Sequence, residues 1–334
     1  MHGWIILDKP LGLGSTQGVS AVKRVLRQGG YGKGIKVGHG GTLDPLATGV
    51  LPIAVGEATK LAGRMLDSDK VYDFTIRFGM QTATLDAEGE SVAESDVRPT
   101  REALEAVLPR FTGPIEQVPP AYSALKVDGE RAYDLARAGE EVVLASRAVT
   151  IHSLKSSPSK LGEGDHRVSD GGGAGRTGDA PPPRPAGAVP LPIGDGEELL
   201  QEITLTAHVS KGTYIRSLAR DIALALGTVG HVTMLRRIKA GPFTLGAAIS
   251  LDKLNEMGQA RTLEQILLPL RAGLDDIPAL ALDPDQAGAL RQGRVLVGIA
   301  VDDGQYFAML GENPVALVEA LDGNVRVVRG FNLD

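Results

Sequence analysis

The chain has 334 residues, of which 43% are apolar and 23% charged, enough for one large domain with a smaller one or for two of intermediate size. It contains no cysteine, which excludes disulfide scaffolds, thiolate zinc sites, iron–sulfur clusters and cysteine nucleophiles, and fits a reducing compartment. Its apolar runs are shorter than the ~18 residues of a membrane span, and its first residues lack the features of a signal peptide. We therefore expect a cytoplasmic protein that has no contact with a membrane.

The net charge of −6 is unevenly distributed along the chain. Residues 1–66 carry eight Lys or Arg against three Asp or Glu, and residues 211–239 carry six against one. The acidic excess lies in residues 251–334, with thirteen acidic and seven basic side chains. Two basic segments predict one binding surface for a polyanion if the fold brings them together. The alternative is ordinary solvated surface charge.

The first half of the chain predicts both helices and strands. Ser15 or Thr16 can cap a helix with apolar residues on one face, which the glycine pair at 29–30 would end. Residues 72–78 alternate as in a half-buried strand, and residues 101–110 predict a second helix.

The second half contains an unusual segment between two predicted strands, 149–154 and 202–209. Residues 156–196 include ten Gly and seven Pro and no aromatic residue, a composition that predicts a disordered insertion. A helix over 215–226 follows. From about residue 279 short β-type runs surround one helix. We expect an α+β catalytic domain over 1–276, with a mixed, largely antiparallel sheet, and a small mostly-β domain over 277–334.

Residues 37–57 hold the densest group of candidate functional side chains. His39, Thr42 and Asp44 lie in a loop rich in glycine, which permits positive φ angles and close approach of the backbone to a ligand. Asp44 could be a nucleophile, a general base or only a turn-forming residue. The loop lacks the Lys and Ser/Thr of a phosphate-binding P-loop. His39 and Asp44 are too few ligands for a metal site, so we expect none.

The literal sequence resembles the TruB family of tRNA pseudouridine synthases, which isomerise the uridine at position 55 of tRNA. GHGGTLDPLATGVL, preceded by DKPLGLGS, resembles the family's first signature. Three further stretches follow in the family's order. They are GEATK with YDFTIRFGMQTATLDAEG, then QVPPAYSALKVDGERAYDLAR, and finally SKGTYIRSLARDIALALG with HVTMLRR. The resemblance covers roughly 1–155 and 200–250. The C-terminal part resembles the family's small RNA-binding PUA-type domain only weakly.

The resemblance implies a role for each matching residue. Asp44 would be the nucleophile, Arg216 the arginine that pairs with it, and Tyr72 the tyrosine that stacks on the target base. His39 would fill the space left by the flipped base. Tyr214 and Leu235 would line the uracil pocket. Lys9 and Lys60 would contact phosphates of the RNA. Other basic residues could share this phosphate-binding role: Lys126, Arg137, Lys211, Arg236 and Arg237. Without the resemblance, each of these residues could equally be a core, loop or surface residue.

The resemblance further implies a substrate, the T arm of tRNA, and neither a cofactor nor an obligatory protein partner. Two other functions stay open. Guide-RNA-directed pseudouridine synthases share these motifs but act within a protein–RNA complex. An RNA chaperone that opens the tRNA elbow would need no chemistry, although Asp44, Arg216 and Tyr72 are all present.

Overall fold

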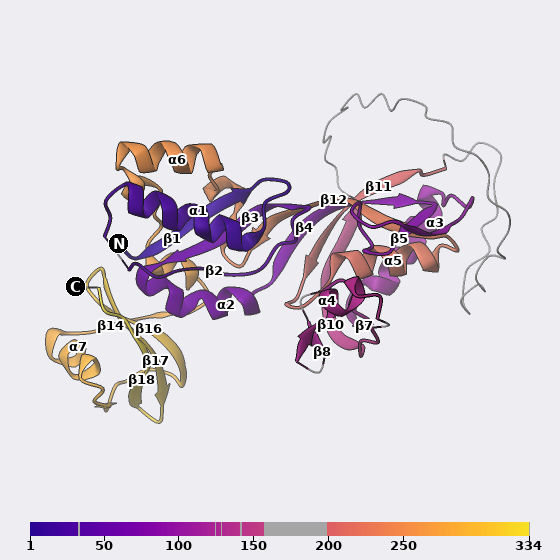
Figure 1. Cartoon of the computed structure of the whole chain (residues 1–334). Coiled ribbons are helices and arrows are strands. Elements are labelled where there is room, and N and C mark those ends of the chain that lie inside the picture. The colour runs from indigo at the N-terminus through magenta and orange to yellow at the C-terminus, as the bar shows by residue number, and fades with distance from the viewer. Residues whose placement is uncertain (33, 124, 128, 141, 157–198, 334) are drawn as a thin grey trace. The chain divides into compact units, whose positions relative to one another are not determined.

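The computed structural model describes residues 1–334 except 33, 124, 128, 141, 157–198 and 334. The described chain forms two compact units, residues 1–71 with 236–334 and residues 72–235 (Figure 1). It passes between them within two strands, β4 (Lys70–Phe78) and β12 (Gly230–Ala240). No described helix is long and apolar enough to cross a membrane. The insertion expected over 156–196 lies outside the described residues, apart from Ser156 at the end of a strand.

The first unit is built on two strongly apolar strands. β1 (Gly3–Lys9) and β3 (Ala47–Val55) pair antiparallel, and most of their residues are buried. β2 (Val37–His39) and β12 also pair with β3, and β13 (Phe243–Thr244) pairs with β12. The described residues of this unit form four α-helices: α1 (Ser15–Gln28), α2 (Ala62–Asp67), α6 (Leu251–Ala260) and α7 (Pro284–Arg291). The sheet therefore offers a rigid base for the loop between β2 and β3.

Helix α1 begins one residue earlier than a Ser15 cap requires and two earlier than a Thr16 cap requires. Its N-cap is Gly14, whose N–H donates to the Gln17 side chain at 2.7 Å. The predicted hydroxyl cap is therefore wrong, because Ser15 is buried and its hydroxyl binds elsewhere. The predicted apolar face is correct: Val19, Val22 and Val25 are buried, and α1 packs against α6.

The second unit contains strands in the order β12-β4-β11-β10-β7. β11 (Glu202–Val209) pairs antiparallel with β10 (Arg147–Ser156), and β10 with β7 (Gly113–Gln117). Helices α3 (Arg101–Val107), α4 (Ala132–Arg137) and α5 (Ile215–Ala225) belong to this unit, as do two short hairpins. The hairpins are β5 (Met80–Thr82) with β6 (Ser91–Glu94), and β8 (Lys126–Val127) with β9 (Glu130–Arg131). The predicted strands and the helix over 215–226 are confirmed.

Residues 279–330 form a separate five-stranded sheet. Its order is β14 (Ala279–Ala281), β16 (Gly304–Leu310), β17 (Asn313–Leu321), β18 (Asn324–Gly330) and β15 (Leu296–Val297). Helix α7 (Pro284–Arg291) starts at Asp283, whose side chain accepts the Gln286 N–H at 2.8 Å, a standard N-cap. The expected α+β fold with a β-rich C-terminal part is confirmed.

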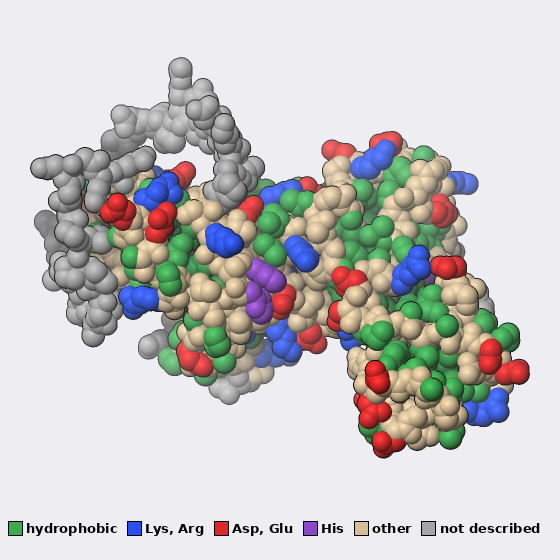
Figure 2. Space-filling model, turned by 180° about the vertical axis from the view of Figure 1, so that it is seen from behind, with side chains coloured by type: hydrophobic (Ala, Val, Ile, Leu, Met, Phe, Trp, Pro, Cys, Tyr) green, Lys and Arg blue, Asp and Glu red, His purple; other side chains and the backbone are tan. Residues whose placement is uncertain are grey.

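The β-rich part has a small core of its own but shares a second one with the rest of its unit. Val318 and Val325 belong to the small core. Phe307 and Phe331 pack in a cluster that also contains Trp4. On the visible face of this part, acidic side chains lie around an apolar area (Figure 2), and residues 277–334 contain eight acidic residues against four arginines. The domain boundary at 276/277 stays a prediction.

Candidate active site

Asp44 lies in a loop, residues 40–46, that joins β2 to β3. Gly41 precedes it with a φ of 143°, and Gly49 follows at the start of β3 with a φ of 98°. A Cβ atom on Gly49 would lie 2.2 Å from the carbonyl oxygen of Arg237 in β12. Only glycine permits this approach, and the backbone that comes so close is a neighbouring strand.

The backbone on both sides of Asp44 is held by hydrogen bonds. The buried Ser15 hydroxyl accepts the Leu43 N–H at 2.8 Å and donates to the Leu43 carbonyl at 3.0 Å. The Pro45 carbonyl accepts the Gly12 N–H at 2.9 Å. Asp44 itself is partly exposed. The loop thus presents a carboxylate from a fixed backbone, as a nucleophile requires.

Lys9, predicted to contact phosphate, lies beneath this loop with none of its surface exposed. Its Nζ donates to the carbonyls of Pro10, Leu13 and Pro45 at 3.1, 2.6 and 3.2 Å. An ammonium group has three N–H donors, and three carbonyls occupy them. This placement argues against a phosphate contact, and we assign Lys9 the role of holding the loop. Burial lowers the pKa of Lys9 to about 8, although the nearby charge of Asp44 raises it.

His39, at the end of β2, is half-buried. Its Nδ1 accepts the Gly41 N–H at 3.4 Å, so a neutral ring carries its proton on Nε2. Burial lowers the pKa of His39, and the Arg237 guanidinium lowers it further. His39 is therefore a neutral ring beside the Asp44 loop.

Lys60 lies in a 3₁₀ turn (Gly56–Leu61), with 29% of its side chain exposed. Its Nζ pairs with Glu57 at 2.6 Å and donates to the Gly330 carbonyl at 2.8 Å. Lys60 thus ties this turn to the end of β18. Its predicted phosphate contact stays a prediction.

Of the other basic candidates, Arg236 and Arg237 point to different surroundings from adjacent positions on β12. Arg236 is partly exposed and pairs with Asp8 at 2.8 Å, which leaves it accessible to solvent. Arg237 is 1% exposed, so it cannot reach a phosphate of bound RNA.

In the second unit, the backbone of Tyr214 is held by a side chain that sequence reasoning missed. The fully buried Gln117 accepts the Tyr214 N–H at 2.8 Å and donates to its carbonyl at 3.1 Å. The Arg147 guanidinium lies over the Tyr214 ring, 4.6 Å from its centroid, a cation–π contact. Two long-range partners thus fix the predicted uracil-pocket tyrosine.

Arg216 is buried in the first turn of α5 rather than on the surface. Its Nη1 lies 3.2 Å from Asp86 Oδ2 and donates to the Thr84 carbonyl at 2.8 Å. Its Nη2 donates to the Tyr122 carbonyl at 3.0 Å. Asp86 is a carboxylate partner that the sequence did not identify, and it also accepts the Glu88 N–H at 3.1 Å. The pairing of Arg216 with Asp44 stays a prediction.

Tyr72 and Leu235 are partly buried and pack against the apolar core of the second unit. Tyr72 lies near the start of β4, where a core contact and an exposed hydroxyl are compatible. The core placement that periodicity suggests for Tyr72 is therefore present, as is the core alternative for Leu235, and the contact of both residues with a base stays a prediction.

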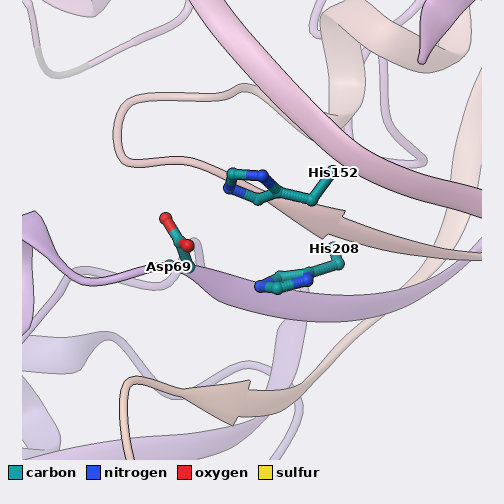
Figure 3. Close-up of side chains that lie close together, drawn as sticks. All are labelled: Asp69, His152 and His208. Carbon is teal, nitrogen blue, oxygen red and sulfur yellow. The ribbon is translucent and has the colours of Figure 1, made fainter. Parts of the chain in front are cut away.

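Two histidines of this unit lie side by side on the neighbouring strands β10 and β11 (Figure 3). The His152 and His208 ring centroids are 4.7 Å apart, at an interplanar angle of 47°. The register of the two strands shifts at His152, which brings its ring beside that of His208. Two imidazoles are fewer than the three or four protein ligands of a zinc site, so the pair alone assigns no metal.

Comparison with known proteins identifies the family of the chain. Residues 23–173 match the N-terminal domain of the TruB family of pseudouridylate synthases, and residues 216–275 match the C-terminal domain of tRNA pseudouridylate synthase B. The tRNA pseudouridine synthase B of Novosphingobium aromaticivorans is 63% identical over 333 residues, covering 100% of this chain and 98% of that protein. The Zymomonas mobilis protein of that name is 55% identical, covering 99% and 96%.

Solved structures share the fold at lower identity. A chain from a Cbf5–Nop10–Gar1 complex superposes with a TM-score of 0.63 at 24% identity, covering 96% of this chain and 78% of that one. A chain from an H/ACA ribonucleoprotein bound to a substrate RNA gives 0.65 at 21% identity, covering 99% and 85%. With relatives of such high identity over its whole length, the chain belongs to the tRNA pseudouridine synthase B family of RNA-modifying isomerases.

Proposed function

We propose that this chain converts the uridine at position 55, in the T loop of tRNA, to pseudouridine, with Asp44 as the nucleophile. The observation that carries the proposal is the 63% identity over the full chain to a tRNA pseudouridine synthase B. The loop geometry supports it, because Asp44 projects from a backbone fixed by Ser15 and Lys9.

The reaction needs a nucleophile and proton transfers but no redox partner. The N-glycosidic bond breaks, the uracil rotates, and a carbon–carbon bond forms between base and sugar. The ring carbon gives up one proton and a ring nitrogen gains one, so the product is an isomer of the substrate. An ionised Asp44 can attack either the sugar or the base, and both routes proceed without a cofactor.

Residues of the second unit would supply charge and a stacking surface. We propose that Arg216 pairs with Asp44 and keeps it ionised and oriented. The carboxylate of Asp86 supports this role, since it holds the guanidinium in place. Tyr72 would stack on the flipped uracil and serve proton transfer through its hydroxyl.

The target base is stacked within the T loop, so binding must extract it. His39 would occupy the vacated space, and a neutral ring suits stacking between bases. Tyr214 and Leu235 would line the pocket for uracil, with the Tyr214 ring held by Arg147. Lys60 would contact a phosphate of the T arm.

The C-terminal residues 277–334 would contribute to RNA binding without supplying chemistry, and residues 1–276 would form the catalytic domain. The acidic composition of residues 277–334 implies that this part contacts RNA through a few specific side chains rather than through its overall charge. We propose that the protein acts in the cytoplasm without an obligatory protein partner.

The test is incubation of the purified chain with an unmodified tRNA transcript, without guide RNA or other proteins, followed by mapping of pseudouridine. We expect one pseudouridine per tRNA, at position 55. Activity that appears only with a guide RNA and partner proteins would favour a guide-directed enzyme. Accelerated tRNA folding without any pseudouridine would favour a chaperone.

A further inference from the structure

Arg237, on strand β12, is a buried charge in the first unit. Arginine is rarely buried unless its donors are satisfied, yet only 1% of Arg237 is exposed. Its guanidinium donates to three backbone carbonyls: Nε to Val50 at 2.7 Å, Nη1 to Thr42 at 3.3 Å and Nη2 to Gly41 at 3.1 Å. One rigid group therefore binds three points of the main chain.

These three carbonyls lie on both sides of Asp44. Thr42 and Gly41 precede it by two and three residues, and Val50 follows it by six. The guanidinium is planar and presents its donors in a fixed fork. It therefore ties the first residues of the loop, Gly41 and Thr42, to strand β3 at Val50, and these residues cannot shift against β3 without breaking a charge-assisted hydrogen bond.

We propose that Arg237 is a positioning residue for catalysis, which holds the Asp44 carboxylate at the place where it attacks the substrate. The inference rests on the proposed function, since it assigns Arg237 a role only if Asp44 is the nucleophile. Arg237 touches no substrate in this account and acts through the loop backbone.

The charge of Arg237 also reaches the other groups around the loop. It lowers the pKa of both Lys9 and His39, in each case after the larger effect of burial. The backbone of Gly41 links the guanidinium to His39, because the Gly41 carbonyl accepts from Arg237 and the Gly41 N–H donates to His39 Nδ1. Loss of Arg237 should thus loosen His39 together with Asp44.

Two substitutions of Arg237 in the full-length protein test the proposal. Arg237→Met removes the hydrogen-bond donors and the charge. Arg237→Lys keeps the positive charge but lacks the planar set of donors that bonds three carbonyls at once. We measure single-turnover conversion of T-arm uridine at saturating enzyme, the Kd for tRNA with its salt dependence, and the melting temperature. A displacement of about 1 Å costs on the order of 100-fold in rate. We expect at least that loss for Arg237→Met, a loss of about tenfold for Arg237→Lys, and a Kd within about threefold of wild type for both.

Controls separate positioning from stability and from charge. Val55→Ala, in the same buried strand β3, should lower the melting temperature without slowing single turnover. Lys253→Met removes one exposed positive charge on α6 and should leave the rate unchanged. If Arg237→Met does not fold, Arg237→Lys alone decides: a wild-type rate would overturn the proposal.

Two outcomes distinguish this inference from the proposed function. A weaker Kd with a smaller salt slope and an unchanged rate at saturation would show that Arg237 binds phosphate, and the proposal would be overturned. Asp44→Asn is measured in parallel. If that variant turns over, the nucleophile assignment itself fails; if it is inactive while Arg237→Met and Arg237→Lys react normally, only the positioning role fails.

Discussion

Lys9→Met tests whether the lysine that contacts the Asp44 loop is structural or binds RNA. Methionine fills a similar volume but donates no hydrogen bond, so it leaves the carbonyls of Pro10, Leu13 and Pro45 without their donor. Each unsatisfied buried carbonyl costs about 1–3 kcal/mol. The substitution also removes the cost of burying the ammonium charge, which offsets part of this loss. We expect a net loss of about 2–4 kcal/mol in the free energy of unfolding.

The pH dependence of this loss has a definite sign. The pKa of Lys9 is about 8 in the folded protein against an ordinary value of 10.5. Between these values the unfolded chain binds more protons than the folded one, so this group makes the protein more stable as the pH rises. The wild type should therefore gain roughly 2 kcal/mol over Lys9→Met between pH 7 and pH 10.

The assays are urea unfolding of both proteins at several pH values and tRNA binding at several salt concentrations. A structural Lys9 predicts that tRNA binding keeps its salt slope, provided that the variant is folded. A phosphate contact predicts a slope smaller by about one unit. Unchanged stability together with a reduced salt slope would refute our assignment of Lys9.

Three further predictions follow from the contacts of the site. Asp86→Asn removes the charge of one carboxylate that holds Arg216 and should slow single turnover about 100-fold with little change in tRNA Kd. Because the folded pKa of His39 is lowered, the wild type should lose stability relative to His39→Gln as the pH falls below 6.5, seen as a difference in melting temperature. Truncation after Ile277 removes Phe307 and Phe331 from a shared core and should destabilise residues 1–277 by several kcal/mol in urea unfolding.

Local patterns in the sequence predicted the elements that bury one apolar face. The strand over 202–209 alternates in sequence, and the structure has it at those residues. The glycines near Asp44 correctly indicated a loop with positive φ angles and a close approach of the backbone, since glycine is the residue that permits both.

Residue type alone could not tell a surface cation from a buried one. The sequence suggested phosphate contacts for Lys9 and Arg237, yet both are buried, and backbone carbonyls accept their donors; among these are Pro45 for Lys9 and Gly41 for Arg237, which are distant in the sequence. One signal was available: adjacent residues of a strand point to opposite faces, so Arg236 and Arg237 could not both face solvent. The alternation of β12 could have indicated that one of them points inward.

The partners of Arg216 and Tyr214 carried no local signal. Asp86 contacts Arg216 from 130 residues earlier in the chain. Gln117 clamps Tyr214 across 97 residues. Ser15 is a residue type that commonly caps helices, but its hydroxyl forms hydrogen bonds with the backbone of Leu43 instead. Such contacts depend on tertiary structure, which periodicity does not specify.

The central claim is that Asp44 is the nucleophile, and one variant tests it most directly. Asp44→Asn preserves the size of the side chain and removes its charge and attacking oxygen. Single-turnover conversion of T-arm uridine is measured at saturating enzyme, with tRNA binding confirmed for the same preparation. We predict normal or tighter binding, because a negative charge beside RNA is lost, and no detectable pseudouridine. Conversion within about tenfold of wild type, a barrier change of only ~1.4 kcal/mol, would contradict the assignment.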